Sequence, residues 1–276
     1  MDTAGRAAEK QRILESSVAI DRSPANGVCQ KTACSKVGPA WIPNSSVSSG
    51  QSAVRMERSR GMTDTKSQPN WRVFHSSAFI LLLGCTLLIR PLRGWPWIWV
   101  APFAGYFLLV ACVRPLRCSL TWLRPGRVSS RTVAATISIM VFTSLFLMAF
   151  QLMAQPRLEA YGATLPFKSL GGIVPAGIIF TIVNATLEEM VFRGILFDGF
   201  EAEWGRGVAL VVTTALFALG HWQGYPPGPV GVCLATMFGL SVGLLRSWTG
   251  GIALPIVAHL GADATIYCIL AKSGTV

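Results

Sequence analysis

The chain has 276 residues, of which 51% are hydrophobic and only 13% are charged. A soluble domain carries about a quarter of charged residues, so this composition excludes an ordinary soluble globular protein. The formal charge of +11 is not accompanied by any nucleic-acid-binding motif or by interleaved basic and aromatic residues, and we expect no nucleic-acid partner. Successive apolar runs of about 17 residues or more can each cross a bilayer core as a helix, which predicts an all-α, polytopic membrane bundle.

The first seventy residues differ from the rest of the chain. Residues 1–70 are rich in Ser, Gly, Lys, Arg, Asn and Pro, and such a segment cannot bury enough apolar surface to fold alone. We expect a disordered polar tail. A mis-called start is the alternative, because Met56 and Met62 precede "MTDTKSQPNWRVF", which would serve as a short cytoplasmic leader.

Residues 71–276 are predicted to form a transmembrane helical domain of about seven helices, or eight. Trp95, Trp97 and Trp99 open the second helix, as expected for rings at the level of the lipid headgroups. Gly239 and Gly243 form a GxxxG pattern that allows close helix approach. The predicted helices cover residues 73–90, 95–113, 132–153, 172–198, 207–223, 229–246 and 251–271.

Basic residues predict the orientation of the helices. The segment 114–131 contains five arginines and no acidic residue, and the tail before the first helix is also basic. Both should be cytoplasmic, so the amino terminus is predicted to be cytoplasmic, and an odd number of helices puts the carboxyl terminus outside. No retention or transit signal is visible, which makes a bacterial inner membrane the default location and the endoplasmic reticulum the alternative.

A few polar side chains interrupt the apolar helices past residue 170. Each ionised group at the centre of a bilayer costs about 2.5–3.5 kcal/mol, so such groups must pair with one another or face a cavity. These polar residues are Asn184, Glu188, Glu189, Arg193, His221, His259 and Asp263.

Helical spacing predicts how these residues pair. Glu189 and Arg193 are four apart and can form an ion pair on one face. Asn184 and Glu188 are also four apart, on a face about 100° away, which leaves Glu188 to face a chamber. His259 lies four residues before Asp263, so the carboxylate can orient the imidazole, or both can point at one ion or water.

This set of side chains can hydrolyse an amide. Glu188 would act as general base, while His221 and His259 would bind zinc or stabilise an oxyanion. A structural ion pair alone and an ion or proton path are the alternatives. His75, at the start of the first helix, is predicted to be interfacial and apart from this set. HExxH is absent from the sequence, and no GxSxG or Ser–His pair is placed as in an intramembrane serine protease.

Three motifs resemble those of the CPBP family, the membrane-embedded CAAX-protease and bacteriocin-processing (Abi) proteins. "EEMVFR" fits its EExxxR motif, "FALGH" its FxxxH motif, and "HLGAD" a variant of HxxxN with Asp263 in place of Asn. All three occur in family order within about residues 170–271, the expected protease core.

The resemblance implies an intramembrane endopeptidase, a probable metalloprotease in which Glu188 activates water. Its catalytic residues would be Glu188, Glu189, Arg193, His221, His259 and Asp263, with Glu188, His221 and His259 as zinc ligands if a metal is used. Its partners would be the bilayer and a peptide or protein substrate that can be membrane-anchored. Nothing in the sequence indicates a prenylated substrate. A non-catalytic scaffold or chaperone-like relative is the alternative.

Overall fold

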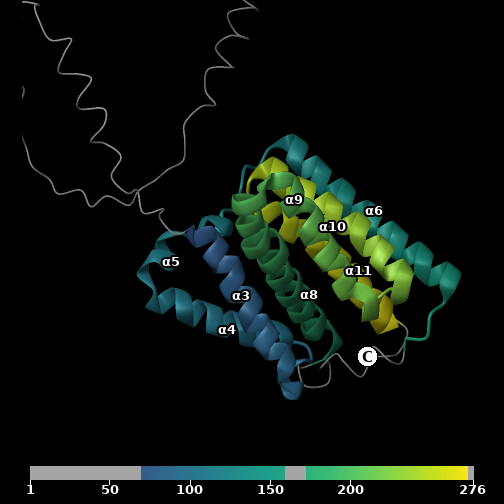
Figure 1. The fold of residues 1–276 in the computed structure, drawn as a ribbon. Coiled ribbons are helices and arrows are strands. Elements are labelled where there is room, and N and C mark those ends of the chain that lie inside the picture. Colours follow the sequence, from purple (N-terminus) through teal and green to yellow (C-terminus); the bar gives the residue numbers. More distant parts are fainter. Residues whose placement is uncertain (1–69, 159–171, 273–276) are drawn as a thin grey trace, which may run out of the picture. The chain divides into compact units, whose positions relative to one another are not determined.

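The computed structural model describes residues 70–158 and 172–272 (Figure 1). The expected tail or mis-called start over residues 1–70 lies outside these described residues, except for Asn70. Within the described ranges every regular element is helical and no strand is present. The predicted all-α class is therefore confirmed.

The first two long helices form a hairpin, as predicted. Helix α3 spans Trp71–Leu88 and α4 spans Trp97–Cys112, joined through the 3-10 turn η1 (Arg90–Leu92). The arginine-rich connection that follows is itself helical: α5 (Arg114–Cys118) and η2 (Thr121–Leu123) bend by 99° from α4. Helix α6 (Ser130–Ala154) then begins at a capping box, in which the Ser129 side chain accepts a hydrogen bond from the backbone N–H of Thr132.

The fourth and fifth predicted helices follow each other without a loop and are separated by a kink at Gly205. Helix α8 (Ile173–Glu189) passes into a π-helix, η4 (Met190–Leu196), then into α9 (Phe197–Gly220) and a 3-10 turn, η5 (His221–Gln223). The sequence predicted a break between residues 198 and 207. That break is present at Gly205, whose φ of 82° and ψ of 166° are not helical, so the helices on either side of it are separate. Helices α10 (Gly228–Thr249) and α11 (Ala253–Lys272) complete the described chain.

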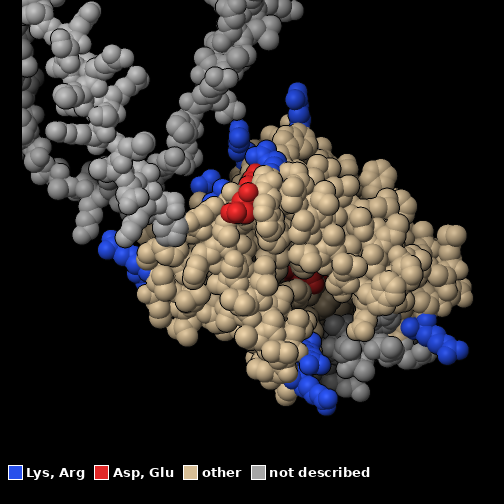
Figure 2. Space-filling view, viewed as in Figure 1, with Lys and Arg blue, Asp and Glu red and all other residues tan. Residues whose placement is uncertain are grey.

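The described helices are those of an integral, multi-pass membrane protein. Five helical segments are long and apolar enough to cross a bilayer, or six if α4 and the bent segment after it count as one span. The number is below seven because the run Ile173–Gln223 holds two predicted helices. In Figure 2 the Lys and Arg side chains visible on this face lie towards its ends, with uncharged surface between them.

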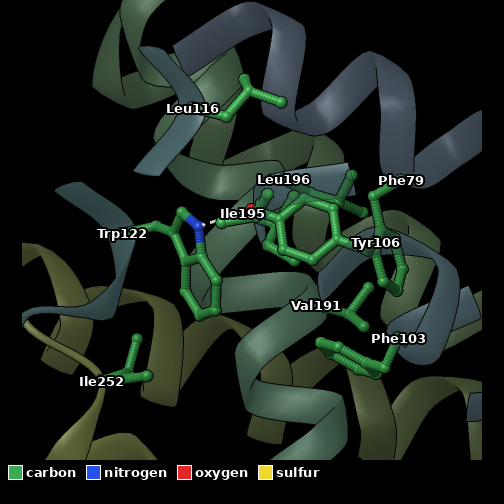
Figure 3. Packing of buried hydrophobic residues seen from close by; sticks show 10 residues of the cluster. Phe79, Phe103, Tyr106, Leu116, Trp122, Val191, Ile195, Leu196 and Ile252 are labelled. Atoms are coloured by element: carbon green, nitrogen blue, oxygen red, sulfur yellow. Dashed lines mark hydrogen bonds between the residues drawn. The ribbon is translucent and has the colours of Figure 1, made fainter. Parts of the chain in front are cut away.

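A buried cluster packs the α3–α4 hairpin against η4. Phe79, Phe103, Tyr106, Trp122 and Ile195 have exposed fractions of 4% or less (Figure 3). The Trp122 indole N–H donates to the Tyr106 hydroxyl oxygen at 2.9 Å. This contact joins η2 to α4, and the Trp122 ring also lies against Gly194 of the π-helix.

His75 belongs to this cluster and not to an exposed interface. Its side chain is 1% exposed. Because Tyr106 already accepts from Trp122, its own hydroxyl donates to Nδ1 of His75 at 2.7 Å, and His75 Nε2 lies 3.0 Å from the Ser119 hydroxyl. His75 is thus apart from the polar set past residue 170, as predicted, and a hydrogen-bond partner on α4 helps to bury its ring.

The GxxxG pattern brings α10 close to α9, as predicted. A Cβ atom on Gly243 would lie 2.5 Å from Leu210 Cδ1, and one on Gly239 would lie 3.1 Å from Phe217 Cδ1. Larger residues would push the two helices apart. The approach matters for the site, since it places the backbone of α10 within reach of Arg193.

Candidate active site

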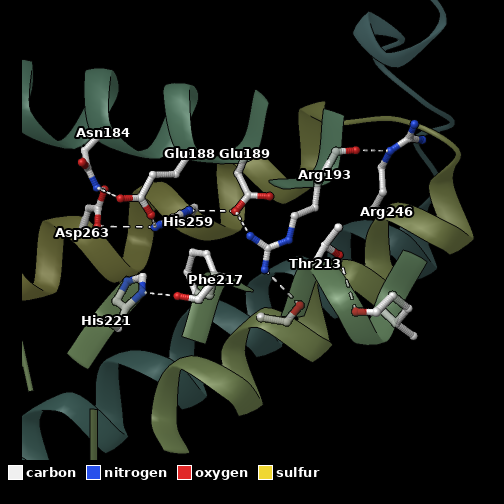
Figure 4. Close-up of polar contacts among 12 residues, drawn as sticks. Asn184, Glu188, Glu189, Arg193, Thr213, Phe217, His221, Arg246, His259 and Asp263 are labelled. Atoms are coloured by element: carbon white, nitrogen blue, oxygen red, sulfur yellow. Dashed lines mark hydrogen bonds and ion pairs between the residues drawn. The ribbon is translucent and has the colours of Figure 1, made fainter. Parts of the chain in front are cut away.

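The seven polar residues come from four elements of the chain that the fold brings together. Helix α8 carries Asn184, Glu188 and Glu189, the π-helix η4 carries Arg193, the 3-10 turn η5 carries His221, and α11 carries His259 and Asp263. Helices α8 and α11 pack along each other, so residues separated by more than seventy positions meet (Figure 4).

Glu189 and Arg193 form the ion pair that their spacing predicted. Arg193 Nη1 donates to Glu189 Oε1 at 2.9 Å, and the two side chains are 1% and 0% exposed. Arg193 Nη2 also donates to the backbone carbonyl of Gly239 at 3.0 Å. The guanidinium lies 4.4 Å from the centre of the Phe217 ring. These three contacts together compensate the buried positive charge of Arg193.

Arg246 supports this arrangement and was missed by the sequence analysis. Its Nε donates to the backbone carbonyl of Arg193, inside the π-helix, at 2.8 Å, and its side chain is buried. Single-turn π-helices occur frequently at functional sites. Helix α10 was predicted to end at residue 246, which would put this arginine at the membrane surface. It runs on to Thr249, and an arginine inside an apolar helix is the signal that could have identified it.

Glu189 also orients His259. The Nδ1 atom of His259 lies 2.8 Å from Glu189 Oε1. A carboxylate accepts hydrogen bonds, so Nδ1 carries the proton and donates, leaving Nε2 for other partners. Nε2 is 3.8 Å from Glu188 Oε2 and 3.6 Å from Asp263 Oδ1, both longer than a hydrogen bond. Two roles were predicted for Asp263. One of them, orienting the imidazole ring of His259, is performed by Glu189 instead.

Glu188 is held by one oxygen and leaves the other without a hydrogen-bond partner. Asn184 Nδ2 donates to Glu188 Oε1 at 3.2 Å, as the four-residue spacing predicted. It also donates to Asp263 Oδ2 at 3.2 Å, a contact that the sequence analysis did not predict. Oε2 of Glu188 is buried and has no hydrogen-bond partner among the described residues. The same holds for Oε2 of Glu189, whose other oxygen is shared by Arg193 and His259.

A cavity of about 210 Å³ adjoins these groups. Its histidine and carboxylate lining residues are His221, His259 and Asp263, and side chains of α6 and α10 form most of the remainder. Nδ1 of His221 donates to the Phe217 carbonyl at 2.8 Å, since a carbonyl can only accept, which leaves Nε2 of this histidine for other partners too. Glu188 is not among the lining residues. Its Oε2 atom lies near Nε2 of His259, a residue that does line the cavity. In Figure 2 a hollow on the drawn face has acidic atoms at its floor.

The cavity opens on the apolar outer surface. Phe142, Phe146 and Met237 line it and are 62%, 49% and 51% exposed. These exposed side chains belong to α6 and α10, two of the helices that can cross a bilayer.

The side chains do not form a ready metal site. Both histidines leave Nε2 for other partners, which suits a metal ligand in its chemistry. However, no three His, Cys, Asp or Glu side chains in the described ranges are grouped closely enough to hold a metal ion. The set predicted for zinc, Glu188, His221 and His259, does not fit a metal as it stands.

The part of the chain that contains the site matches a known protein family. Residues 169–265 match the family described as type II CAAX prenyl endopeptidase Rce1-like. All three motifs lie within these residues, so the resemblance to the CAAX-protease (CPBP) family is confirmed.

One curated relative also matches. The uncharacterized protein YpbD of Bacillus subtilis (strain 168) is 30% identical over 95 residues, which cover 34% of this chain and 46% of YpbD. The chain thus spans less than half the length of the curated relative that it matches. No solved structure matches the chain.

Proposed function

We propose that the chain is an intramembrane endopeptidase that hydrolyses a peptide bond of a membrane-associated protein, with water activated by Glu188. The observation that supports it best is the state of Glu188. A scaffold that kept these charges only for stability would have each carboxylate paired, as Glu189 is with Arg193 and His259. Glu188 instead accepts its hydrogen bond from the neutral amide of Asn184, and its other oxygen is buried without a hydrogen bond, 3.8 Å from Nε2 of the cavity residue His259.

The distances allow one water molecule to touch both groups. Glu188 Oε2 and His259 Nε2 are 3.8 Å apart, so a water at about 2.8 Å from each would sit at the apex of a triangle above them. In this position the carboxylate takes a proton as the water oxygen attacks the carbonyl carbon of the substrate, and a C–O bond forms. The electron pair of the carbonyl moves to its oxygen.

The histidines then stabilise the charge on that oxygen. The cavity presents His259 and His221 with Nδ1 already bonded to Glu189 and to the Phe217 carbonyl. A protonated ring in this orientation donates from Nε2 to the oxyanion. When the intermediate collapses, the C–N bond breaks and Glu188 gives its proton to the leaving amine, which returns the carboxylate to its starting state.

Arg193 and Glu189 act on the substrate indirectly, through the His259 ring. Glu189 fixes the His259 ring, and Arg193 compensates the charge of Glu189. Zinc held by Glu188, His221 and His259 stays a prediction of the sequence, and no step of the reaction is assigned to it. Asp263 lies on the cavity wall, where it faces the substrate.

The substrate class follows from the opening of the cavity. Exposed apolar side chains surround the opening between α6 and α10, so the substrate would enter from the bilayer, as a peptide next to a lipid anchor or a transmembrane segment. The matched family is described as acting on prenylated proteins. Whether this chain needs a prenyl group is a question for the experiment.

The test is hydrolysis in labelled water. Purified protein in lipid nanodiscs is incubated in H2(18)O with a peptide library, half of it carrying a carboxyl-terminal farnesyl cysteine. Mass spectrometry should find one 18O atom in the new carboxyl terminus of the cleaved peptide. A His259→Gln variant purified identically controls for contaminating peptidases. Folded protein that cleaves neither half of the library would contradict the proposal and favour the scaffold alternative.

A further inference from the structure

The site contains more buried negative charge than its cations contact. Glu188, Glu189 and Asp263 are at most 9% exposed. Arg193 and Nδ1 of His259 both bond to Glu189, on the same oxygen, Oε1. Glu188 and Asp263 share a different donor, the neutral amide of Asn184, which lies 3.2 Å from each.

We propose that Asn184 is a positioning residue that holds Glu188 in its reactive orientation by bridging it to Asp263. The inference rests on the proposed function. Asn184 is not among the residues that line the cavity, so it acts through Glu188 and not on the substrate.

The amide suits this role because of its two N–H groups. Nδ2 carries two hydrogens, and the two bonds direct one to Glu188 on α8 and the other to Asp263 on α11 (Figure 4). A lysine or arginine at this position would neutralise Glu188 through an ion pair and weaken it as a base. A neutral donor satisfies one oxygen of each carboxylate and leaves the charge of Glu188 in place.

The bridge also keeps Glu188 and His259 apart. The 3.8 Å between Glu188 Oε2 and His259 Nε2 is about 1 Å longer than a charge-assisted hydrogen bond. If Asn184 were removed, Oε1 would lose its donor, and the repulsion between Glu188 and Asp263 would no longer be bridged. The carboxylate would then turn to Nε2 and form a closed ion pair with the imidazole. In that state neither group is available to the water.

The first experiment is kinetic. Asn184→Ala should lower kcat by between about 10- and 100-fold, the loss typical when a reacting group is misplaced by about 1 Å, while KM stays within about twofold. Thr86→Ala removes another buried hydrogen-bonding side chain, on α3 and outside the site, and should leave both constants unchanged. An equal loss of kcat in both variants would overturn the proposal.

A double-mutant cycle separates positioning from packing. In an Asp263→Asn background the repulsion that Asn184 bridges is absent, so Asn184→Ala should lower kcat at least about threefold less than it does in the wild type. A residue that only packs between α8 and α11 would cost the same in both backgrounds, and equal losses would contradict the bridging role.

A spectroscopic measurement reads the contacts without activity. The chain has four asparagines, Asn26, Asn44, Asn70 and Asn184, so selective 15N labelling gives four side-chain amide signals, and Asn184→Ala identifies the relevant one. Glu188→Gln and Asp263→Asn should each shift this signal and leave that of Asn70 in place. Absence of both shifts would overturn the bridge even if peptides are cleaved. Shifts in a wild-type protein that cleaves nothing would show a structural contact only, and the positioning role would fall with the proposed function.

Discussion

Removing Arg193 is the most severe single charge deletion that this structure offers. Arg193→Met keeps most of the volume of the side chain but leaves Glu189 without its cation. Both side chains are essentially unexposed, at 1% and 0%, so water cannot take over the lost interaction. The variant therefore tests whether the Glu189–Arg193 pair is as inaccessible to water as its exposed fractions indicate.

The magnitude follows from what remains after the change. Breaking a buried ion pair by removal of one partner costs about 3–5 kcal/mol of unfolding free energy. In a double variant, Glu189→Gln with Arg193→Met, no charge is left, and the glutamine oxygen can still accept from His259 Nδ1. The Gly239 carbonyl loses the Arg193 donor but keeps its backbone hydrogen bond within α10, so the cost is that of one hydrogen bond, about 0.5–1.5 kcal/mol. The double variant should therefore be more stable than the single one by about 3 kcal/mol.

The assay is reversible unfolding in mixed detergent micelles, followed by circular dichroism. Arg206→Met is the matched control, because Arg206 pairs with Glu201 at 2.8 Å but is 65% exposed, and an exposed pair contributes at most about 1 kcal/mol. A double variant as unstable as Arg193→Met would refute the reasoning. It would mean that lost packing against Phe217, and not an uncompensated charge, determines the cost.

Three further predictions concern the backbone, the π-helix and the metal. Gly251→Ala should lower the unfolding free energy by at least about 1–3 kcal/mol, because its Cβ would lie 2.0 Å from the backbone nitrogen of Gly126. Gly84→Ala in α3 has open space and should stabilise the protein by about 0.5–1 kcal/mol. Equal effects of the two substitutions in thermal unfolding would contradict the packing around Gly251. Arg246→Met should cost about 1.5–3 kcal/mol in the same assay, since the Arg193 carbonyl loses a charged donor, and an unchanged stability would show that this contact is dispensable. Cleavage should persist in 1,10-phenanthroline, because the described residues contain no group of three metal-binding side chains; loss of cleavage that zinc restores would show that Glu188, His221 and His259 bind the metal.

Local spacing predicted the parts of the site that lie within one helix. The pair of Glu189 with Arg193 and the contact of Asn184 with Glu188 are both four residues apart, and both are present. The apolar runs similarly predicted the helices to within a few residues at most ends. These features depend on helix geometry and hydrophobicity, which one sequence contains.

Contacts between helices could not be predicted in the same way. The bond from His259 to Glu189 and the bridge from Asn184 to Asp263 depend on the register of α11 against α8. The π-helix over Met190–Leu196 gives no periodicity signal in so short a segment, and its partner Arg246 was placed at a helix end. The spacing of His259 and Asp263 suggested a local pair, but a closer carboxylate from another helix took the imidazole.

The most direct test of the account compares three proteins in one cleavage assay: wild type, Glu188→Gln and Glu203→Gln. Glutamine keeps the shape of Glu188 but cannot accept the proton of a water, so the cleavage rate should fall by about 10²–10⁴-fold. Glu203 is an exposed carboxylate on α9, and its variant should cleave at the wild-type rate. A Glu188→Gln protein that cleaves as fast as the Glu203→Gln control would contradict the assignment of Glu188 as the base.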